Sequence, residues 1–145
     1  MDRDRICVSV WSSGGVFIAG LLRDRPSYVR CFVGSYAILD LQQYSAHADE
    51  AARELGERFS AINYLRDIPA SSSPVFIARA GRDEIPLLND GLDRFVAEAL
   101  AENAPVTVVN HPSGEHGFDN QNASERSREI IRGAIEFMRD HLRAE

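Results

Sequence analysis

Four short apolar runs constrain the fold of this chain more than any other feature. They read ICVSVW, VRCFVG, PVFIARA and PVTVVNH, at residues 6–11, 29–34, 74–80 and 105–111. Each run is rich in β-branched or aromatic residues and does not alternate polar with apolar side chains, which is typical of a strand buried on both faces. We therefore expect four strands that are buried on both faces of a sheet.

Helical patterns fill the spaces between and after these runs. Their ranges are 14–24, 46–59, 86–103 and 124–142, and in the third Leu88, Leu92 and Phe95 fall on one stripe of a helix. Alternation of strand and helix is typical of a parallel sheet covered by helices, with right-handed crossovers. We predict an α/β fold with a parallel sheet of about four strands. A chain of 145 residues has the length of one domain, over residues 1–145.

Charge and composition exclude several classes of function. The formal net charge is −6, and the 16 basic residues, all arginines, are scattered among acids. Binding to a phosphate backbone or an anionic membrane surface needs clustered basic residues, so we expect neither nucleic acid nor membrane as a partner. No run approaches the roughly 18 apolar residues of a membrane span. The first ten residues lack the layout of a secretory signal, so we expect a cytoplasmic protein.

The two cysteines, Cys7 and Cys31, both lie inside apolar runs. Neither has a second cysteine or a histidine at the spacing of a metal site. We therefore expect buried free thiols rather than a disulfide or a zinc site. The sequence implies no metal and no organic cofactor.

The loop after the first run contains two serines and two glycines. A nucleophilic serine on a tight strand-to-helix turn needs small residues two positions before and two after it, as in G-x-S-x-G. Ser12 has Gly14 after it and Val10 before it, whereas Ser13 is preceded at that position by the larger Trp11. Ser12 is the better candidate, although such a turn taken alone is more often a simple helix start.

Two further candidates follow the third and fourth runs. Asp83 lies in the loop ARAGRDEIP, and His116 lies in HPSGEHGFD. The carboxyl ends of parallel strands meet at one edge of a sheet, so Ser12, Asp83 and His116 should share that edge. Singly, Asp83 is a plausible turn former and His116 a plausible polar loop residue. Together they follow the chain order of a hydrolase triad, with serine first, then aspartate, then histidine.

Several stretches resemble a known family. RICVSVWSSGG, FSAINYLRDI, SSSPVFIARAGRDEIP and GEHGFD resemble the C-terminal half of α/β-hydrolases of the dienelactone hydrolase, acetyl esterase and prolyl oligopeptidase-like group. The resemblance implies that Ser12 is the nucleophile and His116 the general base and then acid. It also implies that Asp83 orients the imidazole and that the Ser13 N–H is one oxyanion donor.

Two more residues are candidates for substrate contact. Trp11 stands beside the serine, where it could line an acyl pocket or simply pack beside the turn. Tyr36, like Tyr44 and His47, lies in the segment after the second run. In the family that this chain resembles, that segment carries cap elements over the site, although packed or solvated loop residues are more common there.

The sequence departs from the family's pattern at two points. Val10 replaces a small residue, and a β-branched side chain there should crowd the turn. The strands that normally precede the nucleophile are absent, and so is any HGGG-like segment that would supply a second oxyanion donor. The loss of one such donor typically costs on the order of a hundredfold to a thousandfold in rate.

These observations predict a serine esterase that cleaves small carboxylic esters or lactones through an acyl-enzyme on Ser12. The alternatives are a weak or inactive half-hydrolase that acts as a binding or oligomerisation module, and a chain that needs the missing half in trans. In each case the first strand becomes an exposed edge, which invites pairing with another strand. We expect this edge to be covered by self-association, as in a twofold dimer, or by a separate chain that supplies the other half.

Overall fold

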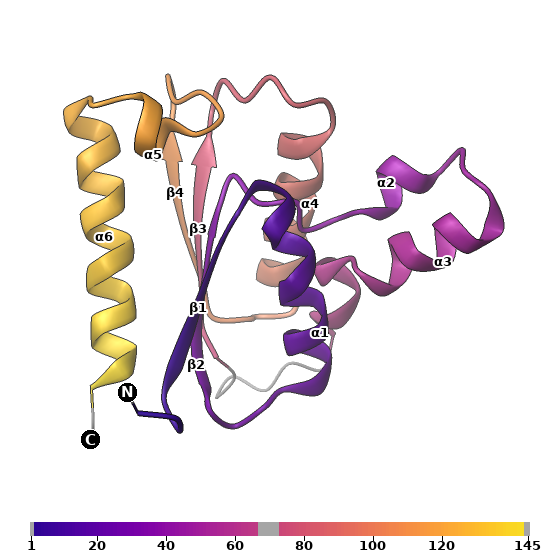
Figure 1. Cartoon of the computed structure of the whole chain (residues 1–145), viewed down its shortest axis with the longest axis horizontal. Helices are drawn as coiled ribbons and strands as arrows, with labels where there is room; N and C mark the ends of the chain where they lie inside the picture. The colour runs from indigo at the N-terminus through magenta and orange to yellow at the C-terminus, as the bar shows by residue number, and fades with distance from the viewer. Residues whose placement is uncertain (1, 67–72, 144–145) are drawn as a thin grey trace.

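Four parallel strands form one sheet in the order β1-β2-β3-β4 (Figure 1). The computed structural model describes residues 2–66 and 73–143. The bounds of the strands are β1 Ile6–Trp11, β2 Val29–Ser35, β3 Val75–Ala80 and β4 Val106–His111. Each bound lies within one residue of an apolar run, so the predicted α/β class and strand number are confirmed.

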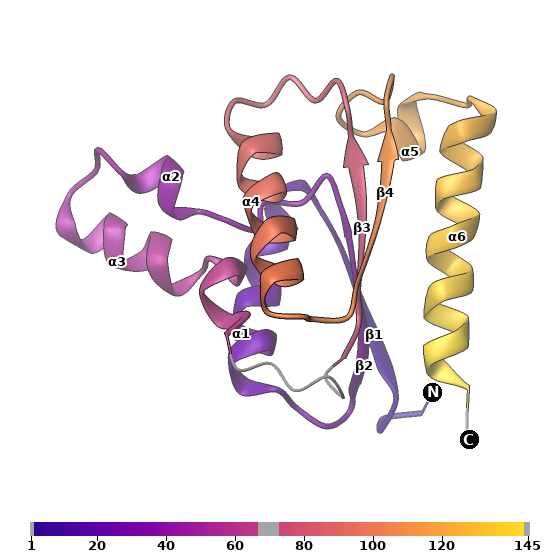
Figure 2. The same cartoon turned by 180° about the vertical axis from the view of Figure 1, so that it is seen from behind.

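Helices cover both faces of the sheet (Figures 1 and 2). Helices α1 and α4 lie on one face and α6 lies on the other, while α2 and α3 project beyond α1 and α4. Their bounds are α1 Val16–Asp24, α2 Gln42–Ser45, α3 Glu50–Arg58, α4 Leu88–Ala101, α5 Phe118–Gln121 and α6 Glu125–Leu142, with 3-10 turns η1 Ser12–Gly15 and η2 Ala61–Tyr64. No helix in the described ranges is long and apolar enough to cross a bilayer.

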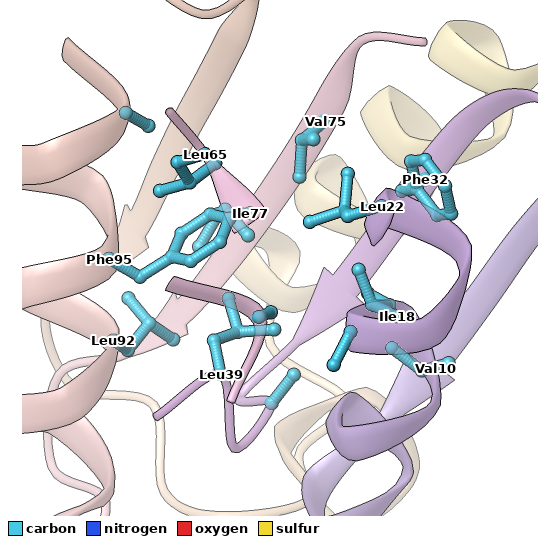
Figure 3. Close-up of a cluster of buried hydrophobic side chains, with 14 of the residues drawn as sticks. Val10, Ile18, Leu22, Phe32, Leu39, Leu65, Val75, Ile77, Leu92 and Phe95 are labelled. Atoms are coloured by element: carbon cyan, nitrogen blue, oxygen red, sulfur yellow. The ribbon is translucent and has the colours of Figure 1, made fainter. Parts of the chain in front are cut away.

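The larger core lies between the sheet and the pair α1 and α4 (Figure 3). Its side chains include Ile18 from α1, Phe32 and Ile77 from the strands, and Phe95 from α4. Successive strand residues point to opposite faces, so Val33 joins a second core under α6. Burying both faces of the strands stabilises the sheet by roughly 1.5 to 3 kcal/mol for each large apolar side chain.

The structure corrects the prediction for the cysteines. Cys7 on β1 and Cys31 on β2 are register partners and form a disulfide, with their Cα atoms 4.6 Å apart. This separation lies within the range that a disulfide can bridge. The expectation of free thiols was wrong because the pairing register, and not the spacing along the chain, brings the two residues together.

The first strand lies at one edge of the sheet, as expected. Within the described ranges β1 pairs only with β2, and β4, at the other edge, pairs only with β3. Ile6 and Trp11 of β1 are 36% and 48% exposed. An apolar groove of about 260 Å³ lies beside Trp11, between β1 and α6, with Ile131 and Ile135 in its lining.

Candidate active site

The backbone of Ser12 has a conformation that is unusual for serine. Ser12 begins η1 directly after β1, and its φ is 51°, in the left-handed region. Non-glycine residues held there cost on the order of 1 to 3 kcal/mol, and they cluster at functional sites. A strained serine on a strand-to-helix turn is the geometry of a nucleophile elbow. Ser13 does not share the positive φ, so the conformation singles out Ser12 of the two serines.

The small residues after Ser12 have different roles. A Cβ on Gly15 would overlap the carbonyl oxygen of Ile38, whereas a Cβ on Gly14 would meet the Val10 Cβ at an ordinary 3.5 Å. The Ile38 N–H donates to the Ser12 carbonyl at 2.9 Å, which draws these two segments together. Val10 is buried in the core with 7% of its surface exposed. The predicted crowding by Val10 is therefore absent, and the tight position is Gly15.

Asp83 and His116 are in direct contact. The Asp83 Oδ2 lies 2.8 Å from the His116 Nδ1, and the Asp83 side chain is fully shielded from solvent while that of His116 is 28% exposed. The other oxygen, Oδ1, accepts the Ile85 N–H at 3.0 Å. This arrangement favours the tautomer with a proton on Nδ1, which leaves Nε2 as the ring nitrogen that can accept a proton.

Backbone hydrogen bonds join the two loops that carry this pair. The His111 carbonyl, at the end of β4, accepts the N–H groups of Gly81 and Gly114, both at 2.9 Å. The Arg82 N–H donates to the Gly114 carbonyl at 2.8 Å. The loop of Asp83 and the loop of His116 are therefore bound to each other as well as to their strands.

His111 has a structural role below these loops. Its ring is buried, and Nε2 lies 3.1 Å from the Ser127 Oγ and 3.4 Å from the Ser124 Oγ of the α6 N-terminus. Burial, reinforced by the Arg126 guanidinium, lowers the pKa of His111. A neutral His111 thus connects β4 to α6 and takes no part in the pair above it.

Ser12, Asp83 and His116 share one edge of the sheet because they follow β1, β3 and β4, which are parallel. Asp83 and His116 are bonded, but among the described residues no hydrogen bond joins the Ser12 Oγ to His116. Trp11 and Ser13 are exposed beside Ser12. Within the described ranges, no three His, Cys, Asp or Glu side chains gather as a metal site.

Comparison with known proteins shows the family of this chain. A sequence model of the prolyl oligopeptidase family matches residues 1–145. The chain belongs to the prolyl oligopeptidase family. No curated protein matches the sequence.

Solved structures of α/β-hydrolases share the fold of this prolyl oligopeptidase family member. A carboxylesterase of Lactobacillus plantarum is similar with a TM-score of 0.67 at 18% identity, over 100% of this chain and 62% of that one. A thermophilic esterase of Thermogutta terrifontis with propionate bound gives 0.75 at 18% identity, over 97% and 58%. A puromycin-hydrolysing peptidase of Mycobacterium tuberculosis gives 0.69 at 17% identity, over 99% and 23%. The chain spans about three fifths of the two esterases, as expected for part of an α/β-hydrolase fold.

Tyr36 of this family member packs against His116. It is buried, and its ring packs edge-on against the His116 ring with the centroids 4.6 Å apart. Its hydroxyl donates to the Asp119 Oδ1 at 2.5 Å, and burial together with Asp119 raises the pKa of Tyr36 well above its ordinary value. The substrate contact expected for Tyr36 stays a prediction, since its observed contacts are with residues of the histidine loop and α5.

Asp119 is a site residue that sequence reasoning missed. It lies only three positions after His116, inside the quoted GEHGFD, but its partner Tyr36 is 83 residues away. Helix α2 is also hydrogen-bonded to the loop that carries Asp83, since the Tyr44 hydroxyl donates to the Pro86 carbonyl at 2.8 Å. No sequence pattern indicates either long-range bond.

Proposed function

We propose that this chain carries the catalytic triad of a serine hydrolase that cleaves small carboxylic esters or lactones. The observation that carries the proposal is the shielded Asp83 bonded to His116 at the sheet edge that also holds the strained Ser12. Membership of the prolyl oligopeptidase family and the esterases of similar fold support the same reaction class.

The proposed reaction has two halves. The Ser12 Oγ attacks the ester carbonyl carbon while the His116 Nε2 takes the hydroxyl proton, and Asp83 stabilises the imidazolium that results. The tetrahedral intermediate collapses as the C–O bond to the alcohol breaks and Nε2 returns the proton to the departing oxygen. Water, deprotonated by the same nitrogen, then attacks the carbonyl carbon of acyl-Ser12. The bond from that carbon to the Ser12 Oγ breaks, Nε2 returns the proton to Oγ, and the acid is released.

The oxyanion of the tetrahedral intermediate needs hydrogen-bond donors. The N–H of Ser13 is the proposed donor, since the first N–H groups of a helical turn have no partner within the helix. A single donor would leave turnover slower by roughly a hundredfold to a thousandfold than with two. Covalent labelling of the nucleophile is therefore a more sensitive assay than turnover.

The test compares the two serines as a matched pair. Wild type, Ser12→Ala and Ser13→Ala are treated with a fluorophosphonate probe and, separately, with p-nitrophenyl acetate. We expect wild type and Ser13→Ala to be labelled, and Ser12→Ala to lose labelling and to lose activity by about a thousandfold or more. Labelling that survives in Ser12→Ala but not in Ser13→Ala would move the nucleophile to Ser13. A wild type that is neither labelled nor active would favour the binding module.

We also propose that the chain acts as a twofold dimer across β1. The free edge of β1, its exposed Ile6 and Trp11, and the adjoining apolar groove support this assembly. In a twofold dimer β1 would pair antiparallel with its own copy, which satisfies the free N–H and C=O groups of both strands. A loop of the second copy near Ser12 would then be in reach to supply the second oxyanion donor.

A further inference from the structure

We propose that Tyr36 and Asp119 form a pair that positions the imidazole of His116. The inference rests on the proposed function, because the orientation of the His116 ring affects the rate only if His116 transfers a proton. Tyr36 packs against the His116 ring and Asp119 holds Tyr36, so both act through His116 and are positioning residues.

The contacts of His116 show why its ring needs a second support. The bond to Asp83 fixes the Nδ1 atom at 2.8 Å, but a single hydrogen bond leaves the ring free to rotate about that point. Tyr36 removes this freedom because its ring lies 4.6 Å from the imidazole centroid, at an interplanar angle of 61°. The imidazole is thus held by a carboxylate at one nitrogen and by an aromatic ring beside it.

Tyr36 in turn depends on Asp119. Its φ is 38°, a strained value that tertiary contacts must maintain, and its N–H donates to the Ala78 carbonyl at 2.7 Å. At the other end of the side chain the hydroxyl donates to Asp119 of α5. Tyr36 therefore bridges the end of β2 to the helix that directly follows the His116 loop.

The geometry of the histidine loop gives this bridge its effect. Gly117 stands between His116 and α5 with a φ of 77°, a conformation that glycine adopts without strain. The Phe118 N–H donates to the Glu115 carbonyl at 3.1 Å across this turn, which holds the backbone but leaves the rotation of the His116 side chain to the contacts of its ring. The Tyr36–Asp119 bond fixes α5 and the ring beside His116 at once.

The test uses four single variants and the double variant Asp119→Ala, Tyr36→Phe. Asp119→Ala removes the acceptor, Asp119→Asn keeps an amide oxygen in its place, and Tyr36→Phe removes the hydroxyl but keeps the ring. Asn120→Ala is the matched control, because Asn120 is the exposed next residue of the same short helix. The readouts are kcat and KM for p-nitrophenyl acetate, the rate of fluorophosphonate labelling, and the NMR shifts of the His116 ring protons.

We expect Asp119→Ala and Tyr36→Phe each to lower kcat by about tenfold to a hundredfold with KM within about twofold, as for a small misplacement of a catalytic group. The double variant should lose no more than either single variant, and Asp119→Asn should recover most of the rate. The His116 ring signals should move in Asp119→Ala and stay in place in Asn120→Ala.

Unmoved His116 signals in folded Asp119→Ala would overturn the proposal, as would equal rate losses in Asp119→Ala and Asn120→Ala. The NMR readout needs no activity. A wild type without esterase activity would therefore contradict the proposed function alone, while the His116 shifts would still decide whether the pair positions the ring.

Discussion

At the scale of single residues, the turn at Ser12 depends on one glycine more than on the motif around it. The motif G-x-S-x-G predicts that Gly14 is the essential small residue, because it lies two positions after the serine. In the structure the space beside Gly14 accommodates a methyl group, and the space beside Gly15 is filled by the Ile38 carbonyl. Close packing against backbone is harder to relieve than packing against a side chain, so the two glycines should respond differently to the same substitution.

We predict that Gly15→Ala lowers the free energy of unfolding by about 1 to 3 kcal/mol, through overlap with the Ile38 backbone. Gly14→Ala is the matched control and should change it by less than about 1 kcal/mol in either direction. Urea denaturation of both variants measures the difference. Equal losses in the two variants would show that the turn does not have the described geometry.

The sequence predicts Ser12, Asp83 and His116 as a triad, because each lies in the loop that follows a run with a strand pattern. The structure shows the contact of Asp83 with His116, and the role of Ser12 stays a prediction. The sequence was not sufficient to find the pairing of Tyr36 with Asp119. A tyrosine after a strand fits a substrate contact as well as a buried support, and only the folded chain shows which groups surround it.

At the scale of elements, β1 is joined to the sheet on one side only, and the disulfide reinforces that side. Cys7 and Cys31 close a loop with a sequence separation of 24 residues that contains α1. Such a crosslink stabilises a fold mainly by restricting the unfolded chain. Persistent disulfides are typical of oxidising compartments and rare in the cytosol. This bond therefore argues against the cytoplasmic location, which stays a prediction.

Reduction of this disulfide should lower the free energy of unfolding by about 3 kcal/mol, from the loop that it closes. The measurement is urea denaturation with and without reductant. The control is the double variant Cys7→Ser, Cys31→Ser, whose free energy of unfolding should not change when reductant is added. Titration of two free thiols in unfolded, unreduced protein would refute the bond.

The strands could be predicted to within a residue because each apolar run is bounded by glycine, proline or polar residues. Only β2 and β3 are buried along most of their length, whereas the edge strands β1 and β4 are not. The disulfide could not be predicted in this way. Its formation depends on the register between β1 and β2, which has an irregularity between Ile6 and Cys7. Apolar runs without alternation carry no signal of register.

At the scale of the whole molecule, the two edges of the sheet differ. The β1 edge adjoins the apolar groove beside α6, in which Trp11 and Ile135 are 48% and 54% exposed. The β4 edge also exposes an apolar residue, Val108, at 40%. Contiguous apolar surface beside an open strand is typical of an interface, so the proposed dimer should form through β1.

We predict that the wild type is a dimer at micromolar concentration and that Ile6→Lys converts it to a monomer, because a buried lysine at the edge of β1 would lack a partner. Val108→Lys is the matched control on the opposite edge and should leave the dimer intact. Gel filtration with light scattering measures the mass. A monomeric wild type, or a heterologous chain bound to β1 in its place, would contradict self-association.

The carbonyl of His111 accepts the N–H groups of both Gly81 and Gly114. The loops of Asp83 and His116 are therefore a more rigid part of the site than the turn at Ser12. Asp83 and His116 lie on loops that are hydrogen-bonded to each other, so twisting of the sheet should leave the distance between these two residues almost unchanged. Ser12 begins the turn that follows β1, and β1 is separated from the loops of Asp83 and His116 by β2, its single partner strand in the described ranges. We predict that the separation of Ser12 from His116 varies more than that of Asp83 from His116, and that a chain docked on β1 would set it.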